Sequence, residues 1–147
     1  MELISINQAA AFLKGCDGYL IYTHASPDGD TIGSAVALAL ILRKMGKKAN
    51  IFSVDGIPSK LSFMPTDGLF IEKEPEDVSG YTLVSVDVAG PKMLGNAKNT
   101  SFSLSIDHHK VNTVESEMHL VMADKIACGE IIFMLLEELG ADIEKLL

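Results

Sequence analysis

The sequence predicts an α/β fold, specifically a doubly wound, mainly parallel sheet of about five strands with helices on both faces. Short apolar runs alternate along the chain with longer segments of helical periodicity, and this order of elements is typical of parallel sheets with helical crossovers. Apolar residues make up 48% of the chain and charged residues 22%, as expected of a packed core. The length of 147 residues suits one domain.

The first part of the chain alternates helix and strand twice. Residues 5–15 have a helical pattern that Ser5 can cap, with a glycine near its end. Residues 19–24 form a short apolar run that favours a buried strand. Residues 30–46 place apolar side chains at helical spacing, with cations near the end and a closing glycine, and therefore predict a helix. Residues 49–54 are predicted as the next strand.

The second part of the chain continues this alternation. Two of its apolar runs end at aspartates, and a long amphipathic segment follows the last run. The predicted elements are a helical turn at 57–65, strands at 81–87, 102–107 and 119–123, a helix at 127–140 and the start of another helix at 141–147.

Unusual polar residues stand where three of the predicted strands end. Three of the four histidines are among them. Because the carboxyl ends of parallel strands meet at one edge of a sheet, where ligands bind, we expect these side chains to gather there. They are His24, Asp28 and Asp30 after the first strand, Asp87 after a later one, and Asp107, His108 and His109 after the next.

Taken singly, these residues have ordinary structural interpretations. Asp28 or Asp30 can cap the helix that starts near Thr31, and Asp87 can be a turn residue. Taken together, four aspartates would repel and desolvate one another unless a cation neutralised them. Carboxylate and imidazole ligands suit Mn²⁺ or a similar ion. A carboxylate such as Asp87 can bridge two ions, as in two-metal phosphoryl-transfer sites.

Charge, apolar runs and cysteines argue against several classes of function. The net charge of −8 speaks against binding to long duplex nucleic acid, which rests on Lys and Arg. No apolar run reaches the roughly 18 residues of a membrane span, and the N-terminus lacks the basic region of a secretory signal. Cys16 and Cys128 match no zinc spacing, so we expect ordinary thiols in a cytoplasmic protein, with Cys128 packed at the start of a helix. The remaining histidine, His119, is expected at the surface.

Three motifs resemble a known group of proteins. "HASPDGDTIGS", "VSVDVAG" and "IDHHK" resemble the first three motifs of the DHH phosphoesterase superfamily. That superfamily includes RecJ-type exonucleases, nanoRNase/pAp-phosphatase proteins and family II inorganic pyrophosphatases. "SFMP" and "ACGEIIFMLLEEL" look most like the nanoRNase/pAp-phosphatase branch. The resemblance covers most of the chain and implies the α/β fold of an N-terminal DHH domain.

The resemblance also implies a set of metal ligands. It assigns His24 and Asp28 to one Mn²⁺ ion and Asp30 and His108 to a second, with Asp87 bridging the two. Mg²⁺ or Co²⁺ are left open as alternatives. The resemblance also implies that His109, Asp87 and Asp107 are the catalytic residues.

The implied activity is that of a Mn²⁺-dependent phosphohydrolase. It would act on phosphoester bonds of short oligoribonucleotides or pAp-like nucleotides through a water activated by two metals, with His109 facing the substrate phosphate and Asp107 orienting the histidine pair. Two alternatives remain open, a family II-like inorganic pyrophosphatase and a non-catalytic module that binds metal or nucleotide. A homodimer is also left open.

The chain departs from the family pattern at its C-terminal end. Members of the family carry a fourth aspartate in a "GDTG"-like segment, and the sequence stops at "ADIEKLL", where that segment should begin. Asp124 is not assigned as its substitute. We therefore expect residues 1–147 to be an N-terminal fragment that lacks the C-terminal substrate-binding domain. We also expect one dominant Mn²⁺ site, formed by His24, Asp28 and Asp87.

The predicted helix at 127–140 carries two neighbouring apolar rows. This is more apolar width than a surface helix needs. One row is expected to pack on the sheet and the other on a segment beyond Leu147. If that second row stays bare, the chain should self-associate.

Overall fold

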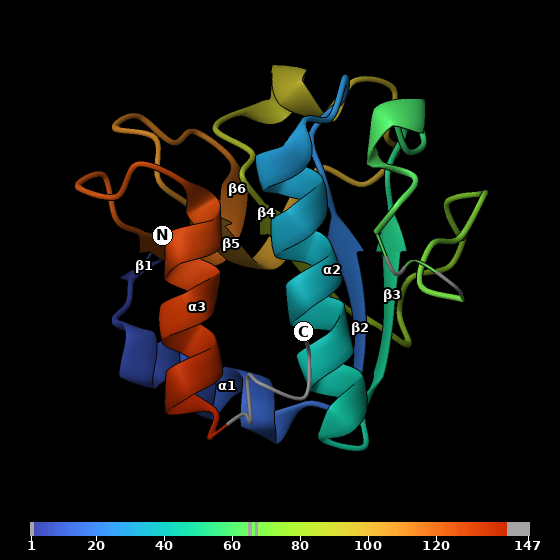
Figure 1. The fold of residues 1–147 in the computed structure, drawn as a ribbon. Coiled ribbons are helices and arrows are strands. Elements are labelled where there is room, and N and C mark those ends of the chain that lie inside the picture. The colour runs from blue at the N-terminus through green and yellow to red at the C-terminus, as the bar shows by residue number, and fades with distance from the viewer. Residues whose placement is uncertain (1, 65, 67, 141–147) are drawn as a thin grey trace.

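The computed structural model describes residues 2–64, 66 and 68–140. A six-stranded sheet runs through them in the order β1-β6-β5-β4-β2-β3, and its neighbouring strands are parallel (Figure 1). This architecture confirms the predicted α/β fold with a parallel sheet. The strands are β1 (Glu2–Leu3), β2 (Gly18–Tyr22), β3 (Lys48–Phe52), β4 (Thr82–Val86), β5 (Ser101–Asp107) and β6 (Glu115–Val121). The helices are α1 (Ile6–Gly15), α2 (Gly29–Lys44) and α3 (Cys128–Glu138), with 3-10 helices η1 (Ser59–Leu61) and η2 (Pro91–Leu94).

The five predicted strands are all present, and β1 is an additional one. Its two residues are exposed and pair with β6, so no apolar run marks it in the sequence. Strand β6 begins at Glu115 rather than at the predicted His119. Its first half is polar and exposed or only partly buried, so no apolar run marks it in the sequence. The helix predicted at 141–147 lies outside the described residues.

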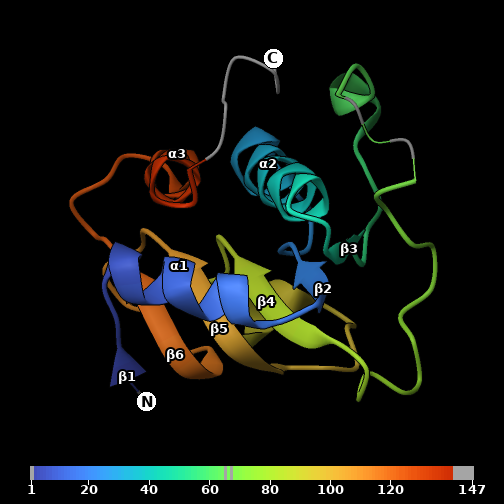
Figure 2. The ribbon, with the colours of Figure 1, turned by 90° about the horizontal axis from the view of Figure 1, so that it is seen from below.

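The three α-helices cover one face of the sheet (Figure 2). Helix α3 packs against both α1 and α2 as well as against β5. The cap predicted at Ser5 is present and is part of a capping box, since the Ser5 hydroxyl accepts from the N–H of Gln8 and the Gln8 amide oxygen accepts from the N–H of Ser5. The main core between helices and sheet includes Leu13, Ile21, Leu38, Val84, Leu104 and Ile131.

The second face of the sheet differs from the prediction of helices on both faces. In the part of the chain that the structure describes, the second core is built from strands, η2 and connecting loops, without an α-helix. The connection between β4 and β5 holds only η2, and the connection between β5 and β6 is the short segment 108–114. Neither connection contains an α-helix. The smaller core on this face includes Leu20, Leu83, Leu94 and Phe102.

The apolar surface of α3 is already covered. Ile131 and Leu135 are buried, and so are Ile132 and Leu136 of the neighbouring row. Both rows belong to the main core, because α3 lies between the sheet and two other helices. The expectation that the row with Ile132 and Leu136 stays bare until a segment beyond Leu147 covers it is therefore wrong. The predicted self-association also involved Ile143, Leu146 and Leu147, which lie outside the described residues, and it stays a prediction. Phe133 is the large apolar side chain of α3 that stays exposed.

Two further side chains are buried. Cys128 is fully buried at the start of α3, as predicted. His119 was expected at the surface, but it is 1% exposed in the middle of β6. The reason is that β6 lies between β5 and β1 in the sheet, so His119 is inside the sheet rather than at its rim.

A partly buried polar network lies on the second face near the start of β5. The Glu74 carboxylate accepts hydrogen bonds from the Tyr22 hydroxyl at 2.5 Å and from the Asn99 side chain at 2.7 Å. It also accepts from the backbone N–H of Lys98 at 2.6 Å. Asn99 precedes β5, whereas Asp107 ends it, so the two lie at opposite ends of a strand about 20 Å long.

Candidate metal centre

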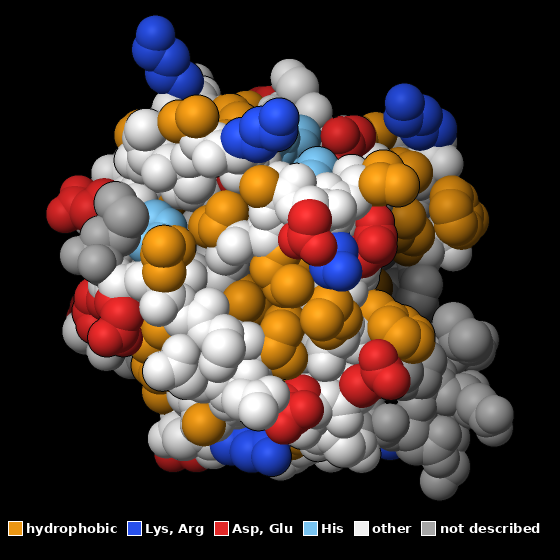
Figure 3. All heavy atoms as spheres, turned by 90° about the vertical axis from the view of Figure 1, so that its left-hand side faces the viewer, with side chains coloured by type: hydrophobic (Ala, Val, Ile, Leu, Met, Phe, Trp, Pro, Cys, Tyr) orange, Lys and Arg blue, Asp and Glu red, His pale blue; other side chains and the backbone are white. Residues whose placement is uncertain are grey.

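The seven residues singled out in the sequence gather at one edge of the sheet. They follow β2, β4 and β5, which are neighbours in the sheet. After β2 the chain turns outward to β3 and then returns to β4 on the other side of β2. Such a reversal of strand order is where open parallel sheets bind ligands. Histidine, acidic and lysine side chains are visible together at the upper rim of Figure 3.

Asp87 lies at the centre of this group. Its carboxylate is almost fully buried, with Oδ2 at 3.6 Å from His24 Nε2 and Oδ1 at 3.2 Å from His108 Nε2. The second contact is short but is not a hydrogen bond, since Oδ1 is buried without a partner. Burial raises the pKa of Asp87, against the opposing influence of His24. A buried acceptor without a donor is costly, and a cation would remove that cost.

The backbone of Asp87 supports this placement. Asp87 has a φ of +63°, in the left-handed region that few residues other than glycine adopt. Its N–H donates to the carbonyl of Ile106 on β5 at 2.9 Å. Backbone strain of this kind is concentrated at functional sites, and here it occurs at Asp87, which lies between His24 and His108.

The first group consists of His24, Asp28 and Asp87, whose ligand atoms lie within 4.8 Å of one another. His24 Nδ1 is 2.7 Å from the carbonyl of Ala25 and must donate to it. In neutral His24 the Nε2 lone pair therefore faces two carboxylate oxygens at 3.6 Å. Without an ion a proton fills this gap, because the Asp87 carboxylate raises the pKa of His24 to about 9 despite burial. A divalent cation can take the place of that proton.

Asp28 has two roles in this group. It is the N-cap of α2, where its Oδ1 accepts from the N–H of Thr31 at 3.0 Å. The interpretation of Asp28 as a helix cap is therefore correct, and it does not exclude metal binding. The same oxygen is 3.6 Å from His24 Nε2, and most of the side chain is open to solvent.

The second group brings Asp87, Asp107, His108 and His109 within 4.8 Å. His108 Nδ1 is 3.3 Å from the carbonyl of Lys125, so in the neutral ring Nε2 is left without a proton. This Nε2 faces Asp87 at 3.2 Å and Asp30 at 3.7 Å. A lone pair opposite two carboxylates repels them unless a cation lies between.

Asp30 does not cap α2, although its position in the sequence allowed that interpretation. Its carboxylate accepts the N–H groups of Cys128 and Gly129, each at 2.9 Å, and so caps α3. In the described part of the chain, Lys and Arg make no ion pair with Asp28, Asp30, Asp87 or Asp107. Among the described residues, the ionisable partners of these four carboxylates are histidines.

Asp107 is fully buried and holds the histidine pair. Its Oδ1 accepts from His109 Nδ1 at 2.6 Å and from the backbone N–H of His108 at 2.8 Å. His109 is the more accessible of the two histidines. The Asp107 carboxylate therefore hydrogen-bonds to both histidines, to the ring of His109 and to the backbone of His108. Such contacts can orient a pair of ligand residues.

Two residues at this site were missed in the sequence. Thr31 links three elements, because its hydroxyl donates to the carbonyl of Val86 at 3.0 Å and accepts from the N–H of His24 at 3.4 Å. Asn112 donates to Asp107 Oδ2 at 2.9 Å. Thr31 follows the acidic motif directly, which is a usable signal. Asn112 stands in a polar loop with nothing in its spacing to mark it.

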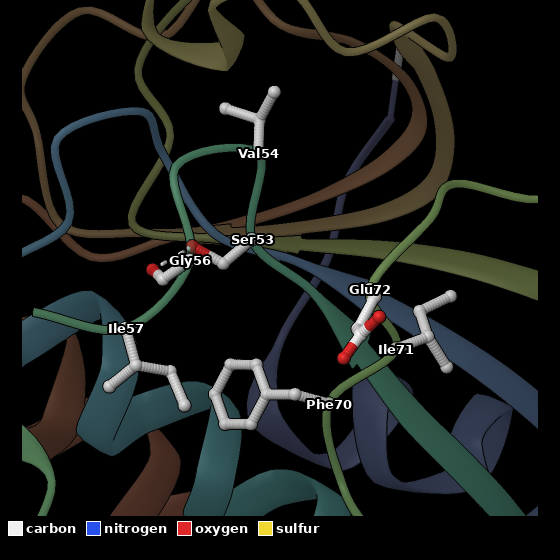
Figure 4. A pocket seen from close by; sticks show the side chains of 7 residues that line it. All are labelled: Ser53, Val54, Gly56, Ile57, Phe70, Ile71 and Glu72. Carbon is white, nitrogen blue, oxygen red and sulfur yellow. Dashed lines mark hydrogen bonds between the residues drawn. The ribbon is translucent and has the colours of Figure 1, made fainter.

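A cavity of about 320 Å³ lies at the end of β3 (Figure 4). In Figure 4 the Ile57 side chain, the Phe70 ring and the Glu72 carboxylate point into the same space. The cavity begins at Ser53, directly after β3. Strand β3 pairs with β2, which ends just before His24, so cavity and centre share one edge of the sheet.

The described residues contain no helix of sufficient length and hydropathy for a membrane span.

The profile of the DHH family, N-terminal domain, matches residues 19–147. A bifunctional oligoribonuclease and PAP phosphatase NrnA from Thermus thermophilus is 33% identical over 134 residues, which cover 90% of this chain and 41% of the relative. The protein of the same description from Bacillus subtilis is 27% identical over 121 residues, covering 81% and 38%.

A solved structure is similar in fold. The crystal structure of an exopolyphosphatase-related protein from Bacteroides fragilis superposes with a TM-score of 0.72 at 20% identity, over 92% of this chain and 43% of that one. The chain thus spans about two fifths of the length of the curated relatives and of this structure.

Proposed function

Because the chain belongs to the DHH family, as its match over residues 19–147 establishes, we propose that it is the metal-binding part of a Mn²⁺-dependent phosphohydrolase. The substrates proposed are short oligoribonucleotides or pAp-like nucleotides. The names of the two curated relatives support this substrate class. The observation that carries the proposal is Asp87, whose two oxygens face two separate histidines while one of them is buried without a donor.

The donor set fits two Mn²⁺ ions, with Mg²⁺ or Co²⁺ as alternatives. His24 and Asp28 would hold one ion and Asp30 and His108 the other, with Asp87 shared. Bound in this way, the ions supply a phosphate clamp and a water of lowered pKa.

Asp107 and His109 have the remaining roles in this proposal. His109, kept in place by Asp107 at 2.6 Å, is open enough to meet the substrate phosphate. Asp107 acts through the histidines and does not touch the substrate, since it is fully buried.

We propose that the cavity at the end of β3 accepts the nucleobase. The Phe70 ring and Ile57 offer apolar walls, and the Glu72 carboxylate can accept from a base amino group. Its volume of about 320 Å³ is at the small end of ligand pockets. Because β3 and β2 are neighbours, this cavity and the metal centre lie at the same edge of the sheet, and the proposal assigns the base to one and the phosphate to the other.

The proposed place of the chain is in a longer cytoplasmic protein with a C-terminal substrate-binding domain, because it spans about two fifths of its relatives. The coding sequence beyond Leu147 tests this directly. A following "GDTG"-like segment and a glycine-rich domain are expected. A stop codon directly after Leu147 would overturn the two-domain proposal.

The function is tested by supplying the full-length protein with Mn²⁺ and measuring hydrolysis of pAp, a short oligoribonucleotide and inorganic pyrophosphate. We expect phosphate release from pAp and mononucleotides from the oligoribonucleotide. Faster cleavage of pyrophosphate would favour the pyrophosphatase alternative. Mn²⁺ binding without any hydrolysis would favour a non-catalytic module.

Phe70→Ala tests the base cavity in the same assay. It should raise KM for pAp about tenfold, in line with the roughly 1–3 kcal/mol per base that stacking on an aromatic ring contributes, and leave pyrophosphate hydrolysis unchanged. Phe63→Ala is the matched control, because Phe63 is highly exposed and does not line the cavity. Equal KM values for Phe70→Ala and the wild type would show that the base does not bind in this cavity.

A further inference from the structure

The side chain of Asn112 is surrounded by groups that fix its orientation. Its Nδ2 lies 2.9 Å from Asp107 Oδ2, 3.2 Å from the carbonyl of Val88 and 3.3 Å from the Ser105 hydroxyl. Its Oδ1 accepts from the N–H of Val114 at 3.0 Å. A carbonyl and a carboxylate can only accept, so the amide nitrogen must face Asp107 and Val88.

Asn112 completes the hydrogen bonds of Asp107. Oδ1 of Asp107 is occupied by His109 Nδ1 and by the backbone N–H of His108, and Oδ2 is occupied by Asn112. The carboxylate is fully buried, so each donor helps to satisfy acceptor oxygens that water does not reach. Because this carboxylate accepts from Nδ1, His109 carries its proton there, and Nε2 is the nitrogen left for other partners.

Asn112 also connects two strand ends. Asp107 ends β5, whereas Val88 follows Asp87 at the end of β4. The loop 108–114 has no helix or strand of its own, yet the amide of Asn112 holds it to both strands. The backbone pairing of β4 with β5 sets the spacing of the two strands, and Asn112 adds a side-chain link between their ends beside the histidine pair.

We infer that Asn112 is a positioning residue, which fixes Asp107 so that His108 and His109 keep their places opposite Asp87. The role in metal binding rests on the proposed function. The effect on the Asp107–His109 hydrogen bond does not, and it can be measured in the metal-free chain.

The test compares Asn112→Ala with Asn99→Ala. Asn99 also donates its amide to a carboxylate, that of the partly buried Glu74, but at the opposite end of β5. The two variants therefore remove similar bonds, and only one of them is near the centre. A role limited to general stability would give both variants the same behaviour.

The first readout is the proton NMR signal of His109 Nδ1 in the metal-free chain. Hydrogen-bonded to a buried carboxylate, it should be shifted far downfield and exchange slowly with water. In Asn112→Ala it should move upfield and exchange at least about tenfold faster, while Asn99→Ala leaves it unchanged. An unchanged signal in Asn112→Ala would overturn the inference, whether or not the protein binds metal.

The second readout is Mn²⁺ affinity, measured by calorimetry. Residues that hold metal ligands in place typically contribute tenfold to a hundredfold in affinity. We expect a loss of this size for Asn112→Ala and none for Asn99→Ala. Equal losses in both variants would reduce Asn112 to a structural residue. A wild-type chain without any Mn²⁺ affinity would contradict the proposed function, and the NMR signal would still decide on Asn112.

Discussion

Asp87→Asn should abolish Mn²⁺ binding at both ligand groups and leave the fold intact. The Asp87 carboxylate faces His24 with one oxygen and His108 with the other, so its loss affects both groups at once. Hydrolysis should fall on the order of a thousandfold or more, because a bound ion stabilises the transition state by several kcal/mol. Calorimetry with Mn²⁺ and the phosphate-release assay measure the two effects.

Asp124→Asn is the matched control for this variant. Asp124 is an exposed aspartate near the same edge, paired only with Lys125 at 3.5 Å. It should bind Mn²⁺ and turn over substrate like the wild type. Metal-free Asp87→Asn should still unfold in one cooperative transition, since the substitution keeps the shape of the side chain and removes both an unfavourably buried carboxylate and its favourable interaction with His24. Activity within tenfold of the wild type, with normal metal content, would contradict the bridging role.

Asp30→Ala should damage both stability and metal binding. In the metal-free chain it removes the acceptor for the N–H groups of Cys128 and Gly129 at the start of α3. Loss of such a cap lowers the free energy of unfolding by about 1–2 kcal/mol. With Mn²⁺ present it should also weaken the group that contains His108, which lies 3.7 Å from Asp30.

Urea unfolding with and without Mn²⁺ separates the two effects of Asp30→Ala. Asp30→Asn keeps one oxygen as an acceptor and should recover part of the stability without recovering metal affinity. Asp124→Ala, at a position that caps no helix, should change neither quantity. If Asp30→Ala unfolds like the wild type in the absence of metal, the capping role of Asp30 is wrong.

The strands and the location of the site could be predicted because their signals are local. Strand β2 is an apolar run that ends just before His24, and strand β4 ends just before Asp87. In a parallel sheet such ends must meet at one edge. The predicted strand ends alone therefore bring the polar clusters to the same edge of the sheet.

Contacts between distant parts of the chain could not be predicted in this way. Asp30 is 98 residues from Cys128, whose N–H it accepts, and a helix cap of this kind leaves no pattern in the sequence. Asn112 acts from a loop without periodicity. The cover of the second apolar row of α3 could not be predicted for a similar reason, because helices α1 and α2 pack on α3 together with the sheet.

The most direct test of the central claim is a Mn²⁺ titration of this chain followed by electron paramagnetic resonance. The claim is that the Asp87 carboxylate is shared by two ligand groups. We predict that the first equivalent binds tightly at His24, Asp28 and Asp87 and gives the six-line spectrum of an isolated ion. A second, weaker equivalent should then reduce that signal through exchange coupling across the shared carboxylate. Two equally tight ions with additive, uncoupled spectra would contradict the account.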